Sequence, residues 1–85
     1  MYKFEIRDDL LKKFKKLKKR NNKRLEIILK KINEIILNPY HYKNLRKPLQ
    51  NLRRVHIDKH FVLTFSIEGK TVFIEDFDHH DNIYN

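Results

Sequence analysis

The spacing of apolar residues changes from a helical period to a strand period near the middle of this 85-residue chain. Leu10, Phe14 and Leu17 follow one another at i, i+4 and i+7, and leucines and isoleucines repeat at similar spacing over residues 25–36. Repeats of this kind place apolar side chains on one face of a helix. The first half of the chain is therefore predicted to form two amphipathic helices.

Polar residues and a proline mark the ends of these helices. Asp8 is suited to cap the first helix, which should end near Arg20. Asn21 and Asn22 interrupt the pattern and can cap the second helix, which should stop before Asn38, because a residue that precedes proline disfavours the helical region. The short link between the helices predicts an antiparallel helical hairpin.

Alternation of apolar and polar residues predicts four strands, at residues 2–7, 52–57, 60–67 and 71–77. Asp58 and Lys59 should form a tight turn between the second and third strands. Residues 38–51 lack a clear period and are predicted to form a loop, with room for one helical turn.

The element order is therefore β-α-α-β-β-β, which predicts an α+β fold in one domain, residues 1–85. We expect an antiparallel sheet with the N-terminal helical hairpin packed on one face, which leaves the opposite face free to bind. A chain this short buries a small core, so a stabilising protein partner is also expected.

Basic residues are concentrated in the first two thirds of the chain. The formal net charge is +9, and residues 1–54 hold 18 basic and 5 acidic side chains, whereas residues 55–85 hold 2 and 6. Such a charge distribution attracts polyanions, although a merely solvated surface is the simpler alternative. The candidate phosphate-binding residues are Lys12, Lys13, Lys16, Lys43, Arg46, Lys47, Arg53 and Lys59.

Cysteine is absent, which excludes disulfides, thiol chemistry and cysteine zinc sites. No apolar run approaches the roughly 18 residues of a membrane span, and the N-terminus has no signal-peptide pattern. We therefore expect a cytoplasmic protein.

Histidines are frequent in the last third of the chain and could exchange protons at neutral pH. Strand alternation directs Val55 and Ile57 to the core, so Arg54 and His56 should share the opposite face, with His60 across the turn. These three side chains could surround one phosphate, or they could be scattered charges on a solvated strand.

The C-terminal run of residues 78–81 contains His79 and His80 between two aspartates. It could bind a metal, supply a catalytic histidine or form a frayed polar terminus. Because neighbouring strand residues point to opposite faces, a metal chelate would need a bend there, and no metal or other cofactor is expected. Tyr84 could stack on a base or hydrogen-bond a phosphate, or it could anchor the terminus through packing with Ile83.

Three stretches together resemble the RelE/ParE superfamily of toxins from type II toxin–antitoxin systems, and the resemblance covers nearly the whole chain. They are the Asn38–Pro39 helix stop with the Leu-rich basic segment up to Leu49, residues 52–65, and residues 77–84. The chain departs from the superfamily pattern at Val62, where an arginine is common, and it lacks the C-terminal arginine.

The resemblance implies a metal-independent endoribonuclease that cuts messenger RNA on the ribosome and inhibits translation. It places Arg54 and His56 where the superfamily has paired basic side chains, and His79, His80 and Tyr84 on its C-terminal catalytic motif. Together with His60 from across the turn, these residues are the candidate catalytic set, in which His79 or His80 pairs with His56 or His60. It also implies an acidic, RelB-like antitoxin with helical segments as the partner. Two alternatives remain at this point, a ParE-like poison of DNA gyrase and a non-catalytic nucleic-acid-binding module.

Overall fold

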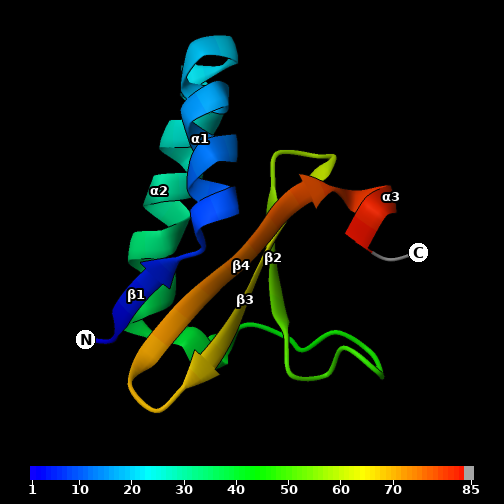
Figure 1. Ribbon diagram of the computed structural model, residues 1–85. Coiled ribbons are helices and arrows are strands. Elements are labelled where there is room, and N and C mark those ends of the chain that lie inside the picture. Colours follow the sequence, from blue (N-terminus) through cyan, green and yellow to red (C-terminus); the bar gives the residue numbers. More distant parts are fainter. Residues whose placement is uncertain (84–85) are drawn as a thin grey trace.

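The computed structural model describes residues 1–83, and Tyr84, one of the predicted site residues, lies outside them. A helical hairpin packs against one face of a four-stranded sheet, and a short final helix follows the last strand (Figure 1). In chain order the elements are β1 (Lys3–Ile6), α1 (Asp8–Arg20), α2 (Asn22–Leu37), the 3₁₀ turn η1 (Pro39–His41), β2 (Arg53–Ile57), β3 (Phe61–Glu68), β4 (Thr71–His79) and α3 (His80–Ile83).

The hairpin forms where the apolar spacing predicts it. Leu10 and Phe14 of α1 and Ile28 and Ile32 of α2 are buried against the sheet. The Asn21 side chain accepts a hydrogen bond from the Arg24 backbone N–H at 3.1 Å, so the predicted cap of α2 is confirmed. Asp8 does not cap α1. It is the first helical residue, and Arg7 precedes it without a side-chain cap.

The sheet has the order β1-β4-β3-β2, and it is mixed rather than antiparallel throughout. β2, β3 and β4 form antiparallel pairs, whereas β1 runs parallel to β4, with Lys3 opposite Thr71 and Ile6 opposite Ile74. The prediction of a purely antiparallel sheet was therefore wrong. Alternation along a short strand reports which side chains are buried, and it carries no information on the direction of the neighbouring strand.

β1 covers only the first half of β4. Beyond Ile74, the open edge of β4 is met by α1, whose Lys13 ammonium donates to the Phe77 carbonyl at 2.7 Å and to the Asp76 carboxylate at 3.2 Å. A lysine predicted to bind phosphate thus has a structural contact at the sheet edge.

The turn between β2 and β3 contains three residues rather than two, because β3 begins at Phe61 instead of His60. Asp58 adopts a positive φ of 56° in this turn, a conformation that aspartate tolerates better than most residues. β4 continues to His79, and residues 80–83 form α3, so much of the predicted polar tail is ordered structure.

The sheet face opposite the helices is partly covered, which corrects the prediction of a free face. Val62, directly between His56 and Asp78 in the strand register, is completely buried, and its neighbour Thr64 on this face is 2% exposed. Leu45, from the loop between η1 and β2, is also buried. Figure 1 shows this loop projecting away from the helical hairpin. No helix within residues 1–83 is long and apolar enough to cross a membrane.

Candidate functional site

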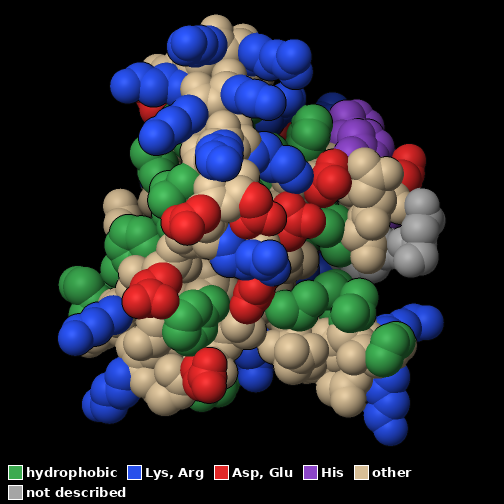
Figure 2. Space-filling view, in the orientation of Figure 1, with side chains coloured by type: hydrophobic (Ala, Val, Ile, Leu, Met, Phe, Trp, Pro, Cys, Tyr) green, Lys and Arg blue, Asp and Glu red, His purple; other side chains and the backbone are tan. Residues whose placement is uncertain are grey.

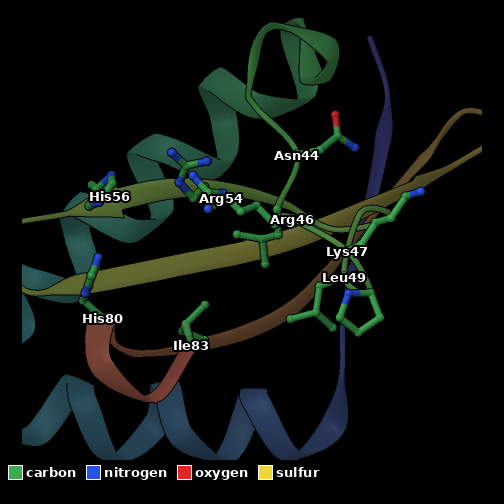
Figure 3. A pocket seen from close by; sticks show the side chains of 10 residues that line it. Asn44, Arg46, Lys47, Leu49, Arg54, His56, His80 and Ile83 are labelled. Carbon is green, nitrogen blue, oxygen red and sulfur yellow. The ribbon is translucent and has the colours of Figure 1, made fainter. Parts of the chain in front are cut away.

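A cleft of about 720 Å³ lies between the loop after η1, β2 and α3. It brings the loop and the adjacent strand β2 together with α3, which is distant from both in the sequence, and Figure 3 shows their side chains. The lining residues are Asn44, Leu45, Arg46, Lys47, Pro48, Leu49, Arg54, His56, His80 and Ile83.

β2 and α3 bring two histidines together in this cleft. Val55 and Ile57 of β2 are buried, as predicted, so His56 points to the opposite face with Arg54 beside it. The His56 and His80 rings stack with centroids 6.0 Å apart and an interplanar angle of 23°. Figure 3 shows the His80 side chain rising from α3 toward β2. We refer to His56 and His80 as the cleft histidines.

The charged residues among the described lining of the cleft are basic, and the Asp81 carboxylate lies 3.6 Å from Nδ1 of His80. Three of the lining residues are Lys or Arg, namely Arg46, Lys47 and Arg54, and the described residues that line the cleft include no Asp or Glu. Figure 3 shows Arg46 close to Arg54, which in turn lies next to His56 on β2. Such a set can bind a phosphate and place two imidazoles beside it.

The other two C-terminal histidines form a separate pair. The His60 and His79 rings are nearly parallel, at 3°, with centroids 5.9 Å apart. The edge of His79 also meets Phe61, whose centroid lies 5.6 Å away, and the strand register places His79 opposite Phe61 on the helix-facing side. We refer to His60 and His79 as the outer histidines. The structure therefore does not place His60 beside Arg54 and His56.

The surroundings of the outer histidines are partly apolar and partly ionic. Phe61 stacks on Phe77 with centroids 5.2 Å apart, and the Arg24 guanidinium lies 4.2 Å from the Phe61 ring centroid. Arg24 also pairs with the Asp58 carboxylate at 2.9 Å. Figure 2 shows histidine side chains near the many Lys and Arg side chains that cover the turn between α1 and α2.

Arg53, one of the predicted phosphate-binding residues, does not line the cleft. Its guanidinium donates to the Tyr42 carbonyl at 2.5 Å and lies 5.0 Å from the Tyr40 ring centroid. Tyr42 itself packs edge-on against Phe65, and burial, followed by the charge of Glu34, raises the pKa of its phenol. Arg53 therefore stabilises the start of the loop that forms the cleft rim.

Four other predicted phosphate-binding lysines are exposed and also lie outside the cleft. They are Lys12, Lys16, Lys43 and Lys59. Two of them are on α1, whose exposed face also carries Lys15, Lys18 and Lys19. They can contribute long-range attraction for a polyanion, but they do not line the cleft.

Sequence reasoning missed several residues that build the cleft. The Asn44 amide donates to the Gln50 carbonyl at 2.6 Å and closes the loop that carries Arg46 and Lys47. Leu45 forms the apolar floor of the cleft, and Leu49 forms part of its rim. The only signal in the sequence was the presence of leucines in an otherwise polar loop, and their burial depends on the sheet face beneath them.

Asp78 fixes the segment that carries His80. Its carboxylate accepts hydrogen bonds from the Asn82 amide at 3.0 Å and from the His79 backbone N–H at 2.7 Å. The Asn82 hydrogen bond above all, then the His79 N–H and the charge of Lys13, lower the pKa of the Asp78 carboxyl, while partial burial opposes this shift. Within residues 1–83, no three His, Cys, Asp or Glu side chains gather closely enough to hold a metal ion.

Comparison with known proteins gives consistent results. The family model described as "ParE toxin of type II toxin-antitoxin system, parDE" matches residues 4–84. A protein of Methanocaldococcus jannaschii that is named as a candidate toxin, RelE4, is 58% identical over 86 residues, which span 99% of this chain and 92% of that protein.

Two solved structures share the fold at low sequence identity. The YoeB/ParE toxin from Agrobacterium tumefaciens has a TM-score of 0.83 at 11% identity, covering 92% of this chain and 98% of that one. The YoeB–YefM complex from Staphylococcus aureus has a TM-score of 0.80 at 14% identity, covering 94% and 98%. With a family model that spans nearly all of its length, the chain belongs to the ParE toxin family of type II toxin–antitoxin systems, within the RelE/ParE superfamily.

Proposed function

We propose that this toxin is a ribosome-dependent endonuclease that cuts messenger RNA in the cleft between β2, α3 and the preceding loop. The observation that carries the proposal is the stacking of His56 and His80, with ring centroids 6.0 Å apart, in a cleft that also contains Arg54. RNA cleavage by its own 2′-hydroxyl requires a base, an acid and positive charge at the phosphate, and these three groups can supply them.

In this mechanism the cleft histidines handle the protons. One imidazole removes the proton of the 2′-hydroxyl, whose oxygen attacks the adjacent phosphorus, and the other protonates the 5′-oxygen as its bond to phosphorus breaks. The products are a cyclic 2′,3′-phosphate and a free 5′-hydroxyl. With rings 6.0 Å apart, both can reach oxygens of one phosphodiester through hydrogen bonds of about 2.8 Å.

Basic residues of the cleft hold the substrate. The Arg54 guanidinium stabilises the charge that develops on the phosphate oxygens, and Arg46 and Lys47 contact the neighbouring phosphates. The position where the superfamily often has arginine is occupied here by Val62, which is buried beneath this face, so the loop arginine Arg46 takes over part of that charge. Lys12, Lys16, Lys43 and Lys59 attract RNA from outside the cleft.

A protein antitoxin is the expected partner. One of the similar structures is a complex of YoeB with YefM. This toxin has a net charge of +9 and exposes large apolar side chains on its helices, among them Leu29 and Leu37. An acidic antitoxin with apolar helical segments would cover such a surface. Its presence is tested by copurification of the toxin with the protein encoded next to it.

A cell-free translation reaction tests the activity. Purified toxin is added with and without ribosomes, and the ends of the messenger are mapped by primer extension. New ends that require translating ribosomes are expected, and they should persist in His41→Asn, a control at an exposed histidine outside the cleft. Intact messenger in every reaction would contradict the proposal.

A poison of DNA gyrase is the second candidate, because the matching family model is that of the ParE toxin. This activity needs no proton transfer by the cleft histidines. A gyrase supercoiling assay separates the two functions. Inhibited supercoiling together with intact messenger would favour the gyrase poison over the ribonuclease.

A further inference from the structure

The helix that presents His80 to the cleft is too short to be stable alone. α3 contains four residues, His80–Ile83, whereas isolated helices of fewer than about 12 residues are marginal even in favourable sequences. Its position must therefore be imposed by contacts with the sheet. These contacts determine where the His80 imidazole lies relative to His56.

Three hydrogen bonds attach the start of α3 to the end of the sheet. The His80 backbone N–H donates to the His60 carbonyl at 2.7 Å, and the Asn82 side chain donates to Asp78 at 3.0 Å. The third involves an imidazole: the Asp81 backbone N–H donates to Nδ1 of His79 at 3.3 Å. His79 thus occupies the place of a helix N-cap, where a side chain accepts from the N–H two residues ahead.

The His79 imidazole is itself held in place by its neighbours. It lies parallel to His60 and edge-on to Phe61, and Phe61 stacks on Phe77 of the core cluster. These contacts are on the helix-facing side of the sheet, whereas His80 lines the cleft on the opposite side. The side chain of His79 is therefore attached to the rigid core and faces away from the candidate active site.

From these contacts we infer that His79 is a positioning residue and not a catalytic one. Its imidazole caps α3 and thereby sets the position of the His80 ring against His56, without touching the RNA. This inference rests on the proposed ribonuclease function, in which His80 is a reacting group, and it divides the adjacent histidines into one that positions and one that reacts.

Two substitutions of His79 distinguish a positioning role from a role in proton transfer. Asparagine is among the best N-cap residues and has no group that could exchange a proton near neutral pH, whereas alanine provides neither property. We expect His79→Ala to lower the rate of messenger cleavage on the order of 10- to 100-fold, because a small displacement of a reacting group has effects of this size. His79→Asn should restore most of the rate.

The opposite pattern would overturn the inference. If His79 itself exchanged protons with the RNA, both variants would lose activity equally, by about 100- to 10,000-fold. Circular dichroism of each variant confirms that it is folded before its rate is compared. His41→Asn serves as the histidine substitution that should leave the rate unchanged.

Amide hydrogen exchange provides a measurement that does not depend on RNA cleavage. The Asp81 N–H should exchange faster in His79→Ala than in the wild-type toxin and should regain protection in His79→Asn. If the wild-type toxin does not cut RNA but Asp81 responds in this way, the capping role stands and the proposed function fails. Unchanged exchange of Asp81 in His79→Ala would overturn the capping role.

Discussion

The cleft histidines and the outer histidines come from nearby positions in the chain, His56 and His60 around the turn between β2 and β3, and His79 and His80 at the junction of β4 and α3, yet their surroundings differ. His56 and His80 lie in a cleft with Arg46, Lys47 and Arg54, and the Asp81 carboxylate lies 3.6 Å from Nδ1 of His80. His60 and His79 lie beside Phe61 on the helix-facing side, where Arg24 is paired with Asp58.

This difference shows that the end of one strand can supply one side chain to a cleft and the next to the core. His79 is the last residue of β4 and His80 the first of α3, so their side chains leave the backbone toward opposite faces of the sheet. One face offers an open, basic cleft, and the other offers an apolar attachment to the core. Adjacent histidines in a sequence therefore need not belong to one site.

The largest expected effect is on cleavage by variants of the cleft histidines. His56→Ala and His80→Ala should each reduce ribosome-dependent messenger cleavage by about 100- to 10,000-fold, because in the proposed mechanism each removes a proton-transfer group. The double variant should be little worse than the poorer single variant, since the two groups act as a unit. Primer extension in cell-free translation measures all three. Full activity in both single variants would remove the proposed distinction between the pairs.

A smaller effect, on stability, is expected from the aromatic attachment of the outer histidines. Phe61→Ala should lower the free energy of unfolding by about 3 kcal/mol, at the lower end of the range for buried phenylalanine, because the ring is only partly buried. His56→Ala, at an exposed position, should change the same quantity by less than about 0.5 kcal/mol. Urea unfolding followed by circular dichroism measures both. Equal losses of unfolding free energy in the two variants would show that the side of the sheet that carries the outer histidines has no special structural role.

The last and smallest of the three predicted losses concerns Asp78. Its carboxylate accepts a hydrogen bond from the Asn82 amide and so attaches α3 to the end of β4. Asp78→Asn should destabilise the protein by less than about 1 kcal/mol at pH 7, since the carboxylate is partly exposed. Because the folded state lowers the pKa of Asp78, its contribution is present above the ordinary aspartate value of about 3.9 and is lost as the pH falls through the lowered value.

Unfolding measurements at pH 7, 5 and 3 on wild type and Asp78→Asn test this pH dependence. The difference between the two proteins should be constant from pH 7 to 5 and should shrink toward pH 3. A difference that grows in acid would mean that the carboxyl is stabilised in its protonated form, contrary to its hydrogen bonds with Asn82 and the His79 N–H.

The sequence alone determined the helical hairpin, the three-stranded meander and part of the site. Apolar spacing predicted which sides of α1 and α2 are buried, because a helix repeats every 3.6 residues whatever it packs against. Strand alternation likewise predicted that Arg54 and His56 face away from Val55 and Ile57. These predictions depend on local geometry, which short stretches of sequence encode.

Tertiary structure alone decided the direction of β1, the covering of the second sheet face and the pairing of the histidines. His80 meets His56 only because β4 lies beside β3, which lies beside β2, and because α3 turns across the end of the sheet. Lys13 was predicted to bind phosphate, yet it contacts Asp76 and Phe77, 63 and 64 residues away. Contacts between distant segments depend on how elements pack together, and the periodicity within each element does not specify them.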